Sequence, residues 1–205
     1  MPPKSIKITY SDQRGRAEVL RLLLVAAGQE FEDCRLNKEQ FEAEKSKTPY
    51  NQLPVIDVDG RRHAQTIAIA SYLAREFGFY GKDNLDALAI DEIVQLNYDF
   101  LNAFVKVYFE TDESKKAELM KHFKEVECPK YFGFFENLLK KNDTGFFVGD
   151  CLSVADLYVY DFAYFLKMLG VTDTANYSHF QNLVEKVESN ERIKAYLATR
   201  KQTPT

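Results

Sequence analysis

Hydrophobic and polar residues alternate at the start of the chain and then adopt helical spacing. Residues 6 to 10 read Ile-Lys-Ile-Thr-Tyr, an alternation that predicts a half-buried strand. Apolar residues then recur with helical spacing from Gly15 to Ala27, and Gly28 stops the pattern. A second strand is expected over Phe31 to Leu36. A strand, a helix and a strand in this order predict a parallel pair joined by a right-handed crossover.

The next segment predicts a short helix, a hairpin and a longer helix. Residues 38–47 are polar with helical spacing, and Pro54 then precedes an apolar, β-branched run. Proline has no N–H, so it belongs at the start or edge of a strand. Asp59-Gly60 between two short strands is a strong hairpin signal, and a helix is expected over Thr66–Phe77. The order βαβ-α-ββα predicts an α/β, thioredoxin-like domain with a mixed sheet over residues 1–79.

The rest of the chain has helical spacing and no good strand pattern. A linker over Phe79 to Asp83 leads to residues 84–205, which we expect to form an all-α C-terminal domain. One long helical segment runs from about Glu113 to Lys141, where Pro129 predicts a kink. Ser153 and Asp156 match a capping box before a helix that is apolar nearly all round, so that helix should be the buried centre of this domain.

Composition and charge exclude several classes of protein. The 205 residues are 45% hydrophobic and 28% charged, which suits a globule with a real core. The net charge of −4 without a basic cluster argues against a nucleic-acid partner. No apolar run reaches the ~20 residues that span a bilayer, and the N-terminus lacks the apolar region of a signal peptide. We therefore expect a cytoplasmic protein with no membrane partner.

Cysteines and histidines predict neither disulfides nor a metal site. The cysteines are Cys34, Cys128 and Cys151. They are odd in number and far apart, as free thiols in a reducing compartment would be. The three histidines have no metal-ligand spacing, so no metal is expected.

Two segments of the first domain predict a cradle for a small peptide. The Leu53-Pro54 bond can be cis at about 0.5–1 kcal/mol over trans, which would turn the Leu53 backbone outward to pair with an extended peptide. Gln65 and Thr66 open a helix whose first N–H groups can bind an anion. Together these residues predict a site for a peptide that carries carboxylates.

Several motifs in this order resemble a cytosolic glutathione S-transferase. They are Tyr10, Arg14-Gly15-Arg16-Ala17-Glu18, Gln52-Leu53-Pro54-Val55, Asp59-Gly60, Gln65-Thr66-Ile67-Ala68-Ile69, Tyr72-Leu73 and Gly149 to Asp156. The run from Arg14 to Glu18 is similar to the sigma-like branch, which includes nematode enzymes. The resemblance covers essentially the whole chain. It implies a homodimer that binds glutathione, as co-substrate and with no other cofactor, on residues 1–79. It also implies that residues 84–205 contribute the site for a small hydrophobic electrophile, in the cleft between the two domains.

The chemistry of such an enzyme requires a thiolate. A free thiol has a pKa of about 8.5, so lowering that pKa by about two units takes ~2.7 kcal/mol of preferential stabilisation of the anion. Tyr10, at the end of the first strand, is the expected hydroxyl, and Arg16 is the expected cation. The alternatives are a Tyr10 ring that only packs on its strand and an Arg16 that is only solvated, although a cation at a helix N-terminus opposes the macrodipole. Ser11 is a rival hydroxyl.

The resemblance also implies which residues hold glutathione. Gln65 and Thr66 should bind the γ-glutamyl end, while Gln52 and the Leu53 backbone before Pro54 should pair with the cysteinyl part. Thr66 is also a plain N-cap candidate, and both roles are compatible.

Phe41 and Lys45 fall where the family places a Trp and a Lys around the glycyl carboxylate. Phe41 cannot donate the indole hydrogen bond, and Lys45 also reads as a surface lysine. Asp99 should reach the γ-glutamyl amine in the partner subunit, or else is an exposed helix carboxylate. Gln95 and Tyr98 replace acidic residues that bind a divalent ion in vertebrate prostaglandin-synthase relatives, so no such metal effect is expected.

The expected function is transfer of the glutathione thiolate to hydrophobic electrophiles, a detoxification reaction, with possible peroxidase or prostaglandin-type isomerase side activity. The alternative is a non-catalytic relative that carries apolar ligands. Tyr10, Gln65 and the hydroxyl at position 66 favour the enzyme.

Overall fold

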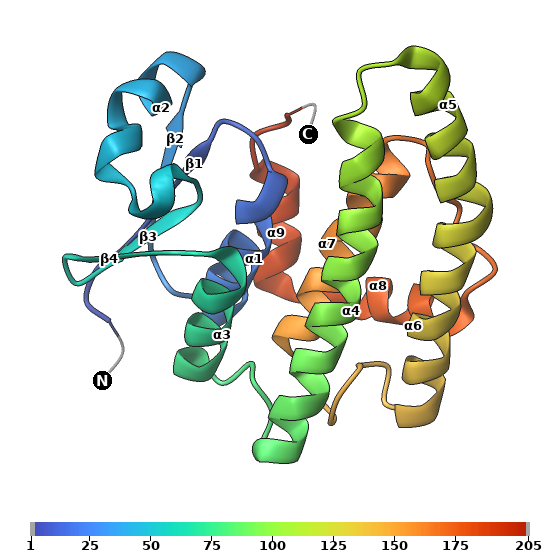
Figure 1. Ribbon diagram of the computed structural model, residues 1–205. Helices are drawn as coiled ribbons and strands as arrows, with labels where there is room; N and C mark the ends of the chain where they lie inside the picture. Colours follow the sequence, from blue (N-terminus) through green and yellow to red (C-terminus); the bar gives the residue numbers. More distant parts are fainter. Residues whose placement is uncertain (1–2, 204–205) are drawn as a thin grey trace. The chain divides into compact units, whose positions relative to one another are not determined.

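The computed structural model describes residues 3–203, which form two compact units (Figure 1). The first unit comprises the described residues up to Tyr80 together with those from Glu188 onward. The second unit runs from Gly81 to Val187. No helix within residues 3–203 combines the length and the apolar character needed to cross a bilayer.

The first unit is built on a four-stranded mixed sheet. The strands are β1 (Ile6–Ser11), β2 (Glu32–Leu36), β3 (Val55–Val58) and β4 (Arg61–Ala64). Their order is β2-β1-β3-β4; β1 and β2 are parallel, and the other pairs are antiparallel. The predicted thioredoxin-like order and mixed sheet are therefore confirmed.

Apolar helices cover this sheet. A 3-10 turn (Gly15–Ala17) leads into α1 (Glu18–Ala27), which packs against α3 (Thr66–Phe77). The bounds of α3 match the sequence prediction. Eight of the ten α1 residues are buried, which agrees with the large share of apolar residues in this helix.

Polar helical segments connect β2 to the hairpin. They are α2 (Lys38–Glu44) and the 3-10 turns Lys45–Lys47 and Pro49–Asn51, which lie in the segment predicted as one short helix and just after it. The Leu53-Pro54 bond is cis, as the sequence permits. Asp59 and Gly60 have φ values of 48° and 80°, the two left-handed residues of a two-residue hairpin turn.

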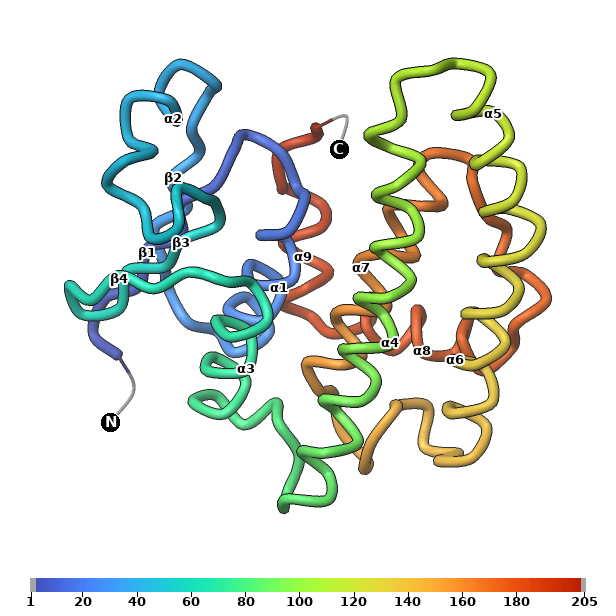
Figure 2. Tube along the Cα trace, viewed as in Figure 1, coloured from blue at the N-terminus to red at the C-terminus, as the bar shows by residue number. Residues whose placement is uncertain are grey.

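The last helix, α9 (Glu191–Thr199), packs against α1 in the first unit, and Figures 1 and 2 show the two side by side. Ile193 is fully buried there, and Arg192 Nη1 donates to Ala26 O at 3.1 Å. The division drawn from the sequence grouped these residues with the helical domain. Periodic apolar positions predict that a helix forms, but they do not tell which neighbour buries it.

The second unit is helical throughout its described elements. Its helices are α4 (Asn84–Tyr108), α5 (Glu113–His122), α6 (Cys128–Asn142), α7 (Val154–Met168) and most of α8 (Ser178–Ser189). Phe100 of α4 is at the centre of an aromatic core, with ring centroids 4.7 Å from Tyr131 and 4.9 Å from Phe162. The all-α prediction is thus confirmed for this unit.

The segment between α5 and α6 differs from the predicted proline kink. A π-helical stretch (Phe123–Glu127) separates the two helices, and Pro129 follows within the first turn of α6. The helical backbone continues through this junction, because His122, Glu127 and Cys128 all have helical φ and ψ values. The wider turn of the π-helical stretch therefore accommodates Pro129, which has no N–H to donate to the preceding turn.

The predicted capping box opens α7. Asp156 Oδ2 accepts hydrogen bonds from Ser153 N–H and from Ser153 Oγ, both at 2.7 Å. Asp156 Oδ1 accepts one from Phe147 N–H at 2.8 Å. Both residues are buried, and α7 buries nine of its fifteen residues, as expected of a central helix.

Candidate active site

The sheet register brings three segments to one edge of the first unit. Thr9 of β1 pairs with Val55 of β3, and Val55 pairs with Ala64 of β4. The residues that extend the three strands beyond this row are Tyr10, Pro54 and Gln65. The ends of β3 and β4 thus lie on one side of the strand end that carries the tyrosine, with the β3 end next to it.

Tyr10 is buried, and its hydroxyl has a hydrogen-bond partner in the following loop. Its Oη accepts a hydrogen bond from the backbone N–H of Arg16 at 3.2 Å. This contact joins the two predicted catalytic residues through the Arg16 backbone, while the Arg16 side chain is exposed. A phenol oxygen that accepts an N–H bond keeps its own O–H to donate.

Gly15 is a residue whose role the sequence did not reveal. Its φ is +42°, and a Cβ at this position would lie 2.6 Å from Tyr10 Oη. Only glycine lets the loop approach the phenol this closely. The sequence did contain a hint, because a glycine between Arg14 and Arg16 can mark a close approach of the backbone. The two arginines alone give no reason for a glycine at this position.

Ser11, the rival hydroxyl, lies next to Tyr10 on the same strand. Successive strand residues point to opposite faces, so the two hydroxyls leave β1 on different sides. Ser11 Oγ accepts a hydrogen bond from Gln13 Nε2 at 2.9 Å.

Gln65 holds an unusual backbone conformation at the start of α3. Its φ is 76° and its ψ is 107°, outside the regions that residues with a Cβ normally occupy, and its side chain is exposed. No side chain caps this helix N-terminus within the described residues 3–203. Backbone strain of this kind costs roughly 1–3 kcal/mol and gathers at functional sites. The sequence does not predict this positive φ, because residues with such a backbone conformation are usually glycines and this one is a glutamine.

Gln52 and Leu53 precede Pro54 in an irregular segment. Tyr50 and Asn51, just before them, also have positive φ values, 59° and 53°. Gln52 is exposed in an extended conformation and Leu53 is half-buried. This places a polar side chain and a backbone segment beside the β3 end of the edge.

Phe41 and Lys45 lie together on the segment that follows β2. Lys45 Nζ is 5.6 Å from the centroid of the Phe41 ring and 3.3 Å from Glu42 Oε1. Both predicted residues are half-buried. Phe41 lies in α2, which begins two residues after β2 ends, and Lys45 begins the 3-10 turn that follows α2. Strand β2 runs beside β1, with Arg35 opposite Tyr10.

Asp99, the remaining predicted residue, belongs to the second unit. It is exposed on α4, in the same helix as Gln95 and Tyr98. The residues grouped at the sheet edge therefore all come from the first unit. Within residues 3–203, no group of three or more His, Cys, Asp or Glu side chains is placed to hold a metal ion.

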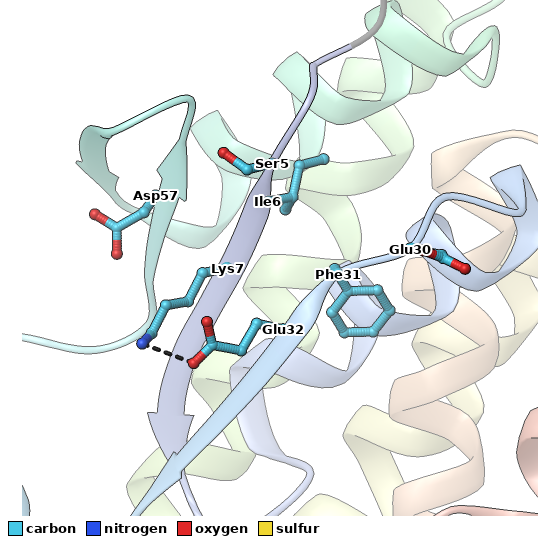
Figure 3. A pocket seen from close by; sticks show the side chains of 7 residues that line it. All are labelled: Ser5, Ile6, Lys7, Glu30, Phe31, Glu32 and Asp57. Carbon is cyan, nitrogen blue, oxygen red and sulfur yellow. Dashed lines mark ion pairs between the residues drawn. The ribbon is translucent and has the colours of Figure 1, made fainter.

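A separate groove opens at the other end of β1 (Figure 3). It is lined by Ser5, Ile6, Lys7, Glu30, Phe31, Glu32 and Asp57. Lys7 Nζ pairs with Glu32 Oε1 at 2.8 Å, and Arg62 pairs with Asp57 at 2.8 Å, so three of the charged side chains in this groove already have ion-pair partners: Lys7, Glu32 and Asp57. It contains neither Tyr10 nor any other predicted site residue.

Two family models match the chain in succession. Residues 6–75 match the glutathione S-transferase N-terminal domain, and residues 98–200 match the glutathione S-transferase C-terminal domain. A curated relative, probable glutathione S-transferase 7 of Caenorhabditis elegans, is 39% identical over 202 residues, covering 97% of this chain and 98% of that protein.

Solved structures agree with this assignment. Prostaglandin synthase D of Nilaparvata lugens superposes with a TM-score of 0.91 at 32% identity, covering 97% of this chain and all of that one. A Nu-class glutathione S-transferase from Haemonchus contortus superposes with a TM-score of 0.89 at 36% identity, covering 98% of this chain and 99% of that one. A glutathione S-transferase from Necator americanus, described as monomeric, superposes with a TM-score of 0.88 at 36% identity, covering 98% of this chain and all of that one. The two domain matches and the full-length relatives thus point to the same family. The chain belongs to the glutathione S-transferase family.

Proposed function

We propose that this glutathione transferase binds glutathione along the sheet edge formed by Tyr10, Pro54 and Gln65, and transfers its thiolate to hydrophobic electrophiles. The observation that carries the proposal is the strand register, which sets a hydroxyl, an irregular backbone segment and a helix N-terminus side by side. These are the three kinds of group that a thiol peptide with two carboxylates requires.

Thiolate formation is assigned to Tyr10 and Arg16. The Arg16 N–H to Tyr10 Oη bond at 3.2 Å draws electron density from the phenol oxygen and leaves its O–H to donate to sulfur. One hydrogen bond to a charged group is worth about 1.5–3 kcal/mol, similar to the ~2.7 kcal/mol that a two-unit decrease of the thiol pKa takes. Arg16, exposed in the first turn, supplies positive charge beside the sulfur.

The peptide backbone of glutathione is assigned to the groups around this hydroxyl. The N-terminus of α3 receives the γ-glutamyl carboxylate, because its first N–H groups and dipole favour an anion and no side chain caps them within residues 3–203. Gln65 and Thr66 contribute their side chains to that end. Gln52 and the Leu53 backbone pair with the cysteinyl residue, as an added strand would.

The glycyl carboxylate is assigned to Lys45. Its ammonium lies against the Phe41 ring and near Glu42, so its position is partly fixed before the ligand arrives. Phe41 contributes packing and no hydrogen bond. A Lys45→Met variant should therefore weaken binding of glutathione more than binding of its γ-glutamylcysteine fragment.

The branch of the family and the side activities are proposed on narrower grounds. The run from Arg14 to Glu18 supports the sigma-like branch, and the fold neighbours include both a prostaglandin synthase and a Nu-class enzyme. We propose peroxidase and prostaglandin-type isomerase reactions as side activities of the same thiolate. Free cysteines at all three positions support a cytoplasmic location.

We also propose a homodimer in which Asp99 of one subunit contacts the glutathione of the other. A two-fold interface repeats each contact, so it creates two equivalent sites. Sedimentation should give twice the chain mass of 23.7 kDa, and Asp99→Ala should weaken glutathione binding. The Necator enzyme described as monomeric shows why this must be measured. An active species of single-chain mass would remove the dimer and the shared contact, and would leave the roles of Tyr10 and Arg16 intact.

The activity is tested by two measurements on the same protein. It should be retained on immobilised glutathione and elute with free glutathione, and it should turn over a chloronitrobenzene with glutathione. Retention without turnover of this or other electrophiles would identify a carrier of apolar ligands instead. Failure of both would remove the proposed site.

A further inference from the structure

The loop that presents Arg16 to Tyr10 is held from behind by one buried arginine. Arg21 of α1 has no exposed surface. Its Nη1 lies 3.2 Å from Gln13 O and 3.3 Å from Arg14 O. Both carbonyls belong to the loop between β1 and the 3-10 turn, directly before the residues that approach the phenol. The guanidinium therefore ties the loop backbone to α1.

Arg21 is itself fixed by two carboxylates. Its Nη1 donates to Glu18 Oε2 at 3.1 Å, and its Nε donates to Asp33 Oδ1 at 3.0 Å. Burial works against the charged form of Arg21, but the negative charges of Asp33 and Glu18 outweigh it, so the pKa of this guanidinium lies above its usual value. The loop is thus held by a group that stays charged at every pH at which the enzyme works.

The last helix completes this cluster from the C-terminal end of the chain. Glu18 Oε1 accepts a hydrogen bond from Arg200 Nη1 at 2.8 Å. Tyr196 Oη lies 3.2 Å from each Glu18 oxygen. Glu18 is fully buried, and Tyr196 of α9 and Arg200 just after α9 both bind the carboxylate that holds Arg21 in place.

Stability alone explains such a cluster poorly. Well-packed apolar side chains in place of a buried ion pair are often neutral or stabilising, because desolvation of the charges offsets their attraction. Arg21 Nη2 is buried and has no hydrogen-bond partner among residues 3–203, which adds to that unfavourable term. What an apolar side chain would lose is the hold on the two loop carbonyls.

We propose that Arg21 is a positioning residue for thiolate formation, which fixes the Gln13 and Arg14 carbonyls so that the Arg16 N–H stays on Tyr10 Oη. This inference rests on the proposed roles of Tyr10 and Arg16. Arg21 touches neither glutathione nor the phenol in this scheme. It acts through the backbone of the loop.

The test is an Arg21→Lys variant, because lysine keeps the charge but lacks the planar fork that spans four acceptors. The pKa of enzyme-bound glutathione is read from the pH profile of kcat/KM and, without turnover, from the ultraviolet absorbance of the bound thiolate. We expect that pKa to rise by about one unit and kcat/KM at mildly acid pH to fall roughly tenfold, with little change in KM for glutathione.

The matched control is Arg192→Ala, which removes a bond between the same two helices at their other end, the Nη1 contact with Ala26 O. It should lower stability without moving the thiol pKa. An Arg21→Lys profile like the wild type, or shifted no more than that of Arg192→Ala, would overturn the inference.

A second variant keeps the test decisive if Arg21→Lys does not fold. Asp33→Asn preserves shape at a partly exposed position and weakens the hold on Arg21 Nε. A raised thiol pKa in this variant supports the inference, and an unchanged one overturns it. Tyr10→Phe distinguishes failure of the proposed thiolate role of Tyr10 from failure of the positioning role of Arg21. Normal turnover in Tyr10→Phe overturns both roles. Slow turnover in Tyr10→Phe together with a normal pH profile in Arg21→Lys overturns only the role of Arg21.

Discussion

The helices α3 and α7 begin with different solutions to the same requirement. Every helix starts with N–H groups that have no acceptor within the helix. At α7 the protein supplies the acceptors: the Ser153 side chain accepts from the backbone N–H of Asp156, and the Asp156 carboxylate accepts from the backbone N–H of Ser153. At α3 no side chain caps the start within residues 3–203, and Gln65 adopts a positive φ.

The difference separates a helix start that stabilises the fold from one that we propose binds a ligand. Asp156 and Ser153 are buried and fully used by their neighbours, so their removal should affect folding and not chemistry. The Gln65 side chain is exposed, so its removal should weaken binding without destabilising the fold. Substitutions at the two helix starts should therefore have opposite signatures.

The largest expected effect is on folding, in Asp156→Ala. This change leaves the buried Phe147 N–H and the Ser153 donors without their acceptor, and each unpaired buried group costs about 1–3 kcal/mol. We expect the free energy of unfolding in denaturant to fall by about 3 kcal/mol or more. Ser153→Ala, the milder control, should lower it by only ~0.5–2 kcal/mol. Loss of turnover at unchanged stability in either variant would contradict the structural role.

The next effect is a pH dependence of stability from the same carboxyl. Burial raises the pKa of Asp156 to about 6, while the hydrogen bonds from Phe147 and Ser153 act in the opposite direction. Because the folded state binds this proton more tightly than the unfolded state, the contribution of Asp156 to stability is full below the usual carboxyl pKa and is lost as pH rises towards 6.

Two pKa units correspond to at most about 3 kcal/mol. The measurement is the free energy of unfolding from about pH 3 to pH 7, a window that brackets the two pKa values, in the wild type and in Asp156→Asn. The difference between the two curves removes the contribution of other carboxyls, such as Glu136, whose pKa is lowered. A difference that does not change with pH would show that Asp156 does not titrate in this range.

Chemistry at the sheet edge should respond to Tyr10→Phe. Loss of one hydrogen bond to a charged sulfur is worth about 1.5–3 kcal/mol, so turnover should fall roughly 10–150-fold with little change in glutathione affinity or in melting temperature. Ser11→Ala is the matched control, since this hydroxyl lies on the next residue of the same strand. Greater damage from Ser11→Ala would reassign the thiolate contact.

Features set by neighbouring residues could be predicted from the sequence. The bounds of α3, the Asp59-Gly60 turn and the capping box of Ser153 and Asp156 all depend on contacts a few residues apart, and the structure has each of them. The composition of each segment was enough to specify them.

Features set by distant partners could not be predicted. The sequence places α9 as a helix but does not show that Arg200 would reach Glu18, because 182 residues separate the two partners. The left-handed conformation of Gln65 is also hidden, since surrounding structure imposes it on a residue that does not prefer it. At the candidate site the sequence therefore suggests which residues to test, whereas it does not show the backbone conformation that presents them.

The smallest expected effect tests that hidden conformation directly, through Gln65→Gly and Gln65→Ala. Both variants lose the side chain, so both should bind glutathione about tenfold more weakly, near the ~1.4 kcal/mol of one weak charge-assisted contact. Glycine adopts a φ of 76° without a Cβ clash, whereas alanine keeps the strain. The melting temperature should therefore be higher for Gln65→Gly than for Gln65→Ala, although the two bind alike. Equal melting temperatures would mean that the backbone at the start of α3 is not strained. Normal glutathione binding by both variants would mean that the Gln65 side chain does not contribute to binding and that the backbone N–H groups of the helix start are sufficient.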